Sequence, residues 1–146
     1  MSKTSDIIQF HYLESAFSFD NRNACKRFIT SLFKKEKTPL DNLTYIFCDD
    51  EYLLNINRDF LKHDYYTDIV TFGLSEKGSP VTGEIYISIT RVKDNAITHG
   101  EPFYRELHRV IFHGALHLCG YRDKSKAEQE KMREMEDKYL NAYFTR

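Results

Sequence analysis

LHRVIFHGALHLCG, at residues 107–120, is the segment around which we expect the rest of the chain to fold. Its apolar side chains recur at helical spacing, as Leu107, Val110, Ile111 and Leu118. Pro102 lies where a first helical turn tolerates proline, and Gly120 lies where a helix commonly ends. The pattern therefore predicts a long amphipathic helix that begins after Gly100, ends at Gly120 and packs one face on a core.

The segments before this helix alternate between strand-like and helical patterns. We expect strands at residues 7–10, 43–48, 68–74 and 83–90, which are rich in β-branched and aromatic residues. We expect helices at residues 23–35, 51–61 and 91–98, with Pro39 closing the first. Residues 75–80 have the length and composition of a hairpin loop, so the last two strands should be antiparallel neighbours.

The chain after Gly120 adds one more helix. Ser125 and Glu128 form a capping-box pattern, and apolar side chains recur behind it at helical spacing. The 146 residues contain no internal repeat, low-complexity tract or linker. We therefore predict an α+β fold in a single domain, residues 1–146, with a small central mixed sheet of about four strands packed by about five helices.

Composition excludes several classes of protein. Twenty-one basic residues face twenty-two acidic ones, so the chain has no overall field that attracts nucleic acid or an anionic membrane. The first residues lack the pattern of a signal peptide, and no segment approaches the roughly 20 apolar residues that span a bilayer. Cys25, Cys48 and Cys119 are scattered, as expected of buried thiols in a reducing cytosol. We expect a cytoplasmic protein with no membrane partner.

The same helix carries a candidate metal site. His113 and His117 stand four residues apart, so their imidazoles share one face and can share one ion. Gly120 can adopt the left-handed conformation that reverses the chain, which would bring Asp123 towards them. Chance HxxxH pairs are common, and Gly114 occupies the position where zincin proteases carry a glutamate. We expect one Zn²⁺ or another divalent ion per chain, held by these two histidines and Asp123 with a fourth position open.

Four short motifs resemble one known family. HGALHLCGY at residues 113–121 is similar to the HGxLHLxGY signature of the YbeY family, bacterial endoribonucleases that act in ribosomal RNA maturation. LNINR at 54–58, TDIVTF at 67–72 and GEI at 83–85 resemble the family's LNxxYR helix, TDVLSF strand and GDI strand start. The motifs follow the family's order and cover residues 54–123.

Three positions depart from the family pattern. Asp123 stands where the family usually has a third histidine, Asn57 replaces a tyrosine, and Glu84 replaces the aspartate of GDI. An aspartate can still ligate. Because a carboxylate in place of an imidazole lowers the net charge of the metal centre by one, it should shift metal preference towards harder ions.

Three further residues are candidates for roles at this site, one of them because of the resemblance. Arg58 matches the family's functional arginine, whose fork suits a phosphate oxygen, whereas the sequence alone favours a surface salt bridge with Asp59 or Glu51. Asp68 either orients a metal-bound histidine through its second ring nitrogen or shapes the turn into its strand. Glu84 is a candidate general base for catalysis, although a carboxylate at a strand start is more often solvated.

Other charged and aromatic residues give weaker signals. His63, His99 and His108 have no ligand spacing, and we expect them at the surface. The densest basic stretch is either a solvated helix face or an RNA-backbone surface, and consists of Arg22, Lys26, Arg27, Lys34, Lys35 and Lys37. The ten tyrosines and eleven phenylalanines lie mostly at core spacing, so none can be assigned to base stacking.

Taken with its metal ligands, the resemblance implies a single-strand-specific, metal-dependent endoribonuclease acting in 16S rRNA 3′ end maturation and ribosome quality control. Its expected partners are ribosomal RNA, the small ribosomal subunit and ribosome-assembly proteins, without a nucleotide cofactor. The ion would polarise a phosphodiester oxygen or activate water, and Arg58 would offset charge in the transition state. Two alternatives stay open: a ribosome-assembly factor with a structural metal, and a metal hydrolase acting on another ester or amide.

Overall fold

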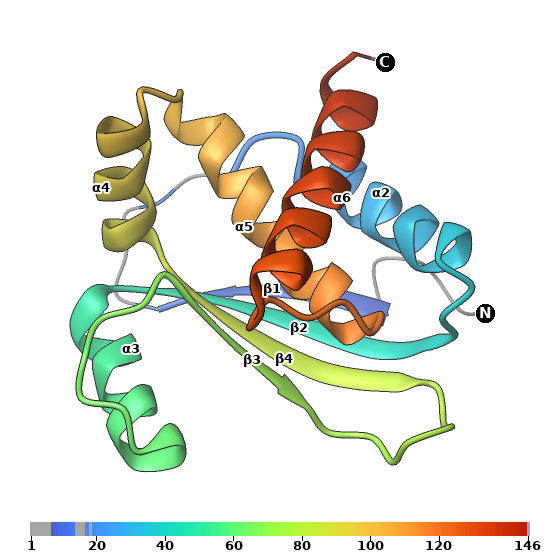
Figure 1. The fold of residues 1–146 in the computed structure, drawn as a ribbon, viewed down its shortest axis with the longest axis horizontal. Coiled ribbons are helices and arrows are strands. Elements are labelled where there is room, and N and C mark those ends of the chain that lie inside the picture. Colours follow the sequence, from blue (N-terminus) through green and yellow to red (C-terminus); the bar gives the residue numbers. More distant parts are fainter. Residues whose placement is uncertain (1–6, 14–16, 18, 146) are drawn as a thin grey trace.

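A four-stranded mixed sheet forms the centre of the computed structural model, which describes residues 7–13, 17 and 19–145 (Figure 1). In spatial order the strands are β1 (Ile8–Tyr12), β2 (Leu40–Cys48), β4 (Val81–Ser88) and β3 (Ile69–Gly73). The first three run parallel, and β3 pairs with β4 in the antiparallel direction. The predicted mixed sheet and its antiparallel pair are therefore confirmed.

Helices cover both faces of this sheet. They are α2 (Arg22–Lys35), α3 (Asp50–Ile56), the π-helical turn η1 (Asn57–Leu61), α4 (Ile89–His99), α5 (Phe103–Leu118) and α6 (Lys126–Phe144). Figure 1 shows α2, α4, α5 and α6 on one side of the sheet and α3 on the other. The α+β fold is thus as predicted. No helix among the described residues is long and apolar enough to cross a membrane.

The centre of the core is α5, which lies close to strands β3 and β4. A Cβ added to Gly114 would meet Ile85 Cδ1 at 2.9 Å and Ile69 Cδ1 at 3.0 Å, so only glycine allows this approach. The Tyr45 hydroxyl donates a hydrogen bond of 2.9 Å to the Ile111 carbonyl of α5, and both residues are fully buried. The histidines of α5 are therefore fixed relative to the edge of the sheet.

Local sequence signals set several helix ends. Gly120 has a φ of 108°, and Ser125 and Glu128 form the predicted capping box of α6. The strand expected at residues 83–90 instead ends at Ser88, because the Ser88 side chain accepts a hydrogen bond from the Arg91 amide and caps α4. The helix expected at residues 51–61 divides into α3 and the wider turn η1.

One surface prediction is wrong: His108 is fully buried. Its ring stacks on Tyr143 with centroids 4.8 Å apart, and its Nδ1 lies 2.8 Å from the Tyr104 carbonyl oxygen. Tyr104 and Phe112, four residues to either side of it, continue an aromatic stripe along α5, and this spacing is the sequence signal for its burial. Burial lowers the pKa of His108 to about 4.

Candidate metal centre

Two histidines and an aspartate meet at the C-terminal end of α5. His113 and His117 lie on its last two turns, and the reversal at Gly120 brings Asp123 back towards them. The Nε2 atom of His113 lies 3.2 Å from Asp123 Oδ2. All three side chains line one open pocket of about 390 Å³, between α5, β3 and η1. The structure thus brings together the three residues that the sequence singled out as ligands.

The loop that carries Asp123 is held by hydrogen bonds at its base. The Gly120 amide donates to the His117 carbonyl at 3.0 Å, and the Tyr121 amide donates to the Leu116 carbonyl at 3.1 Å. The Tyr121 hydroxyl donates to Glu36 Oε1 at 2.8 Å, which ties the loop to the end of α2. The His117 Nδ1 atom lies 3.1 Å from the Tyr121 carbonyl oxygen, so Nε2 is the nitrogen left to bind a ligand.

The two imidazoles and the carboxylate are donor types that suit a divalent ion, and the spacing of one pair of donor atoms also fits. Bonds of about 2.0–2.2 Å at tetrahedral angles place two donor atoms about 3.4 Å apart. The 3.2 Å separation between His113 and Asp123 is close to that value. Within the described part of the chain, however, no three His, Cys, Asp or Glu side chains already surround a common point. Binding through all three residues therefore requires side chains to turn, His117 included.

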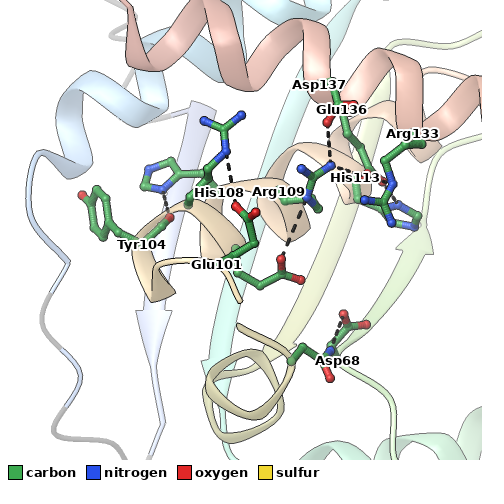
Figure 2. Close-up of polar contacts among 12 residues, drawn as sticks. Asp68, Glu101, Tyr104, His108, Arg109, His113, Arg133, Glu136 and Asp137 are labelled. Carbon is green, nitrogen blue, oxygen red and sulfur yellow. Dashed lines mark hydrogen bonds and ion pairs between the residues drawn. The ribbon is translucent and has the colours of Figure 1, made fainter. Parts of the chain in front are cut away.

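A buried carboxylate on α6 orients His113. The Nδ1 atom of His113 lies 2.7 Å from Glu136 Oε2 (Figure 2). Arg109 Nη1 in turn lies 3.1 Å from Glu136 Oε1 and 3.0 Å from Asp137 Oδ1. Burial alone would lower the pKa of His113, but the hydrogen bond and charge of Glu136 outweigh it and raise that pKa. With Nδ1 donating to Glu136, Nε2 of His113 faces the pocket as the candidate ligand.

Glu136 was not predicted from the sequence. It lies 23 residues from His113, and no local spacing connects the two residues. One signal was present, because Glu136 lies four residues after Met132 and three before Tyr139, on the apolar face of the last helix. A carboxylate on that face is rarely buried without a partner.

Asp68 does not make the hydrogen bond that we expected it to make to the second ring nitrogen of a candidate ligand histidine. Its Oδ2 atom accepts a hydrogen bond of 3.3 Å from Asn95, and Glu136 and the Tyr121 carbonyl occupy the Nδ1 atoms of the two histidines. Asp68 does line a smaller polar pocket of about 170 Å³ that also includes His113 and Glu136. Burial raises the pKa of Asp68. Its backbone carbonyl accepts from the Ser88 amide, so it also helps to place the start of β3.

Arg58 lies on η1 with half of its side chain exposed. Its Nε atom is 2.5 Å from Asp64 Oδ1, a different partner from the two acids considered from the sequence. Its side chain does not line the pocket of the histidines. That exposed ion pair contributes little to stability.

Glu84 lies on the face of the sheet opposite α5. Its neighbours in β4, Gly83 and Ile85, face α5, and alternate strand residues point to opposite faces. The Tyr86 hydroxyl donates to Glu84 Oε1 at 3.2 Å, and burial together with this carboxylate raises the pKa of Tyr86 to about 12. The structure therefore does not bring Glu84 to the histidines.

The basic residues of α2 lie on a helix whose C-terminal end contacts the loop of Asp123 through Glu36 and Tyr121. Arg22, Arg27, Lys34 and Lys35 are exposed, whereas Lys26 is partly covered and lies 5.0 Å from the centroid of the Phe10 ring. In Figure 1, α2 and α3 lie at opposite ends of the molecule, and η1 follows α3 directly. None of these residues lines the pocket of the histidines.

Comparisons with known proteins agree on one family. A family model described as "Endoribonuclease YbeY" matches residues 6–144. The chain is 48% identical to the endoribonuclease YbeY of Cytophaga hutchinsonii over 136 residues, which cover 93% of this chain and 95% of that protein. It is 44% identical to the protein of the same name from Flavobacterium johnsoniae, covering 92% and 95% of the two chains. A Thermotoga maritima protein solved in solution aligns with a TM-score of 0.61 and 27% identity, covering 92% of this chain and 89% of that one.

Proposed function

The chain belongs to the YbeY endoribonuclease family, and we propose on that basis that it is a metal-dependent endoribonuclease whose ion is held by His113, His117 and Asp123. The observation that supports this most is the 3.2 Å approach of His113 and Asp123 in a pocket that His117 also lines. Two imidazoles and one carboxylate form a common ligand set of catalytic zinc. We propose one zinc ion per chain, or a harder divalent ion in its place.

Different residues of the chain orient the proposed ligands and contact the substrate. Glu136 keeps the Nδ1 proton of His113 in place, and Arg109 holds Glu136 through an ion pair. When bound, the ion would lower the pKa of water and offset charge on a phosphodiester oxygen. Lys124 lines the same pocket and can contact a neighbouring phosphate. We retain Arg58 as a further phosphate contact, because its exposed guanidinium can exchange Asp64 for an RNA phosphate.

The substrate that we propose is single-stranded ribosomal RNA, cleaved during 16S rRNA 3′ end maturation in the cytoplasm and in ribosome quality control. The name shared by the relatives supports RNA as the substrate class. The small ribosomal subunit and its assembly proteins follow as proposed partners. The basic residues of α2 do not line the pocket, so we propose that they contact RNA or subunit surface outside it.

Metal content tests this proposal directly. Protein purified without chelators should contain about one equivalent of zinc or a similar ion. His117→Ala and Asp123→Ala should both lose the ion, whereas the control His99→Ala, an exposed histidine outside that pocket, should keep it. A metal-free wild type, or an Asp123→Ala variant that keeps both metal and activity, would overturn the assignment.

Cleavage of a labelled single-stranded oligoribonucleotide completes the test. Wild type should cut it, and a chelator or His117→Ala should abolish cutting. Arg58→Ala should keep its metal and lose most of the cleavage rate. If Arg58→Ala cuts RNA at the wild-type rate, Arg58 has no role in the reaction. If metal-loaded wild type cuts no RNA but hydrolyses another ester or amide, the substrate class is wrong.

A further inference from the structure

Two aromatic rings lie at the edge of the pocket, on the segment between η1 and β3. His63 and Tyr65 stack with their centroids 5.0 Å apart and their planes 16° from parallel. Both side chains are exposed, Tyr65 to 55%. Both line the pocket that contains His113, His117 and Asp123. We call this ring pair the aromatic shelf.

The backbone beneath the aromatic shelf is held in place. Asn57 is fully buried, and its Nδ2 atom donates to the Tyr65 carbonyl at 3.3 Å and to Thr67 Oγ1 at 2.9 Å. The His63 amide donates to the Asn57 carbonyl at 3.0 Å. Because these bonds fix the segment before any ligand arrives, a ring that stacks on the shelf pays little for ordering it.

Tyr66, the next residue, differs from Tyr65 because both its hydroxyl and its ring contact other side chains of the protein. Its hydroxyl donates to Glu51 Oε2 at 2.7 Å, and the Arg91 guanidinium carbon lies 5.0 Å from its ring centroid. Tyr66 does not line the pocket. The exposed ring of Tyr65 is therefore open to a ligand in the pocket, whereas that of Tyr66 already has partners.

The charges around the aromatic shelf suit an RNA strand. Lys124 lines the pocket, and Lys62 is an exposed residue adjacent to His63. Proteins that bind single-stranded nucleic acid combine basic side chains for the phosphates with flat aromatic rings for the bases. A base in a duplex is paired and stacked on its neighbours, so only an unpaired base can turn onto such a shelf.

We propose that His63 and Tyr65 stack an unpaired nucleobase of a single-stranded RNA whose adjoining phosphate lies in the pocket. The choice of RNA rests on the proposed function. The position of the shelf, inside the lining of the same pocket, makes it a means of selecting unpaired RNA next to the bond that is cut. Because the Tyr65 side chain is 55% exposed and offers the larger ring, it should carry most of the effect.

Binding without cleavage tests the aromatic shelf. Fluorescence anisotropy in the presence of a chelator would give the Kd of a short labelled oligoribonucleotide and of a matched strand with abasic sites. Tyr65→Ala should weaken binding of the base-carrying strand about five- to a hundredfold and leave binding of the abasic strand unchanged. Tyr65→Phe should bind like wild type, because the ring is kept. Tyr66→Ala, the matched control, should also bind like wild type.

The outcomes separate this inference from the proposed function. An unchanged Kd in Tyr65→Ala would overturn the shelf. An equal loss for both strands would also overturn it, because such a loss does not depend on the bases and indicates a general disturbance of the segment. If wild type cleaves RNA while Tyr65→Ala binds it normally, the proposed function stands and the shelf fails. If Tyr65→Ala loses base-dependent binding while wild type cleaves no RNA, the shelf stands and the nuclease proposal fails.

Discussion

Replacing His108 with phenylalanine should remove a defined part of the acid sensitivity of the fold. His108 is fully buried, and its Nε2 atom has no hydrogen-bond partner among the described residues. A proton added there would be a buried, unpaired charge, and burial lowers the pKa of the ring from 6.5 to about 4. Between these two values the unfolded chain binds a proton that the folded chain does not. The free energy of unfolding therefore falls as the pH is lowered through this window.

The size of this effect follows from the pKa difference. Each pKa unit corresponds to about 1.4 kcal/mol, so His108 should cost the wild type about 2 kcal/mol on going from pH 7 to pH 5, and about 3 kcal/mol by pH 4. Phenylalanine keeps an aromatic ring beside Tyr143 and carries no titratable group. Any packing cost of its larger ring would apply equally at every pH.

Urea unfolding followed by circular dichroism at pH 7, 6 and 5, in the presence of a chelator, measures the difference between the two proteins. The gap between pH 7 and pH 5 should be about 2 kcal/mol smaller in His108→Phe than in wild type. His99→Phe, which replaces an exposed histidine, is the control and should keep the wild-type gap. An equal gap in wild type and His108→Phe would refute the account of His108 as a buried neutral histidine.

Two further predictions concern the placement of the ligands. Gly114→Ala should destabilise the fold by about 1–3 kcal/mol, seen as a lower Tm, because its Cβ would lie 2.9 Å from Ile85 Cδ1; a wild-type Tm would mean that α5 is free to move away from the sheet. Glu136→Gln should weaken metal binding about ten- to a hundredfold in a chelator competition, because a neutral amide orients His113 less strongly than a carboxylate. Unchanged affinity would mean that this hydrogen bond does not position the ligand.

Local patterns in the sequence predicted much of this fold, and their limits have a physical cause. The start of α6 could be predicted from the capping box at Ser125. The chain reversal after α5 could be predicted from the glycine at position 120, which has a positive φ. The parallel order of β1, β2 and β4 depends on pairings between segments that are distant in the sequence. The spacing of apolar residues within one segment does not show which strand it will pair with. Glu136 could not be assigned for the same reason, because its contact with His113 forms only when α6 packs on α5.

Asn57 is tied by hydrogen bonds to the segment that borders the pocket. This position is fully buried, and its short amide donates both to the Tyr65 carbonyl and to Thr67 Oγ1. A hydroxyl or an apolar side chain could not donate both bonds from the same buried space, because two N–H donors on one nitrogen are needed. The Asn57 amide thus fixes the backbone on which Tyr65 stands. A change at Asn57 would therefore be felt at the edge of the pocket of the histidines, which Asn57 and Tyr65 both line.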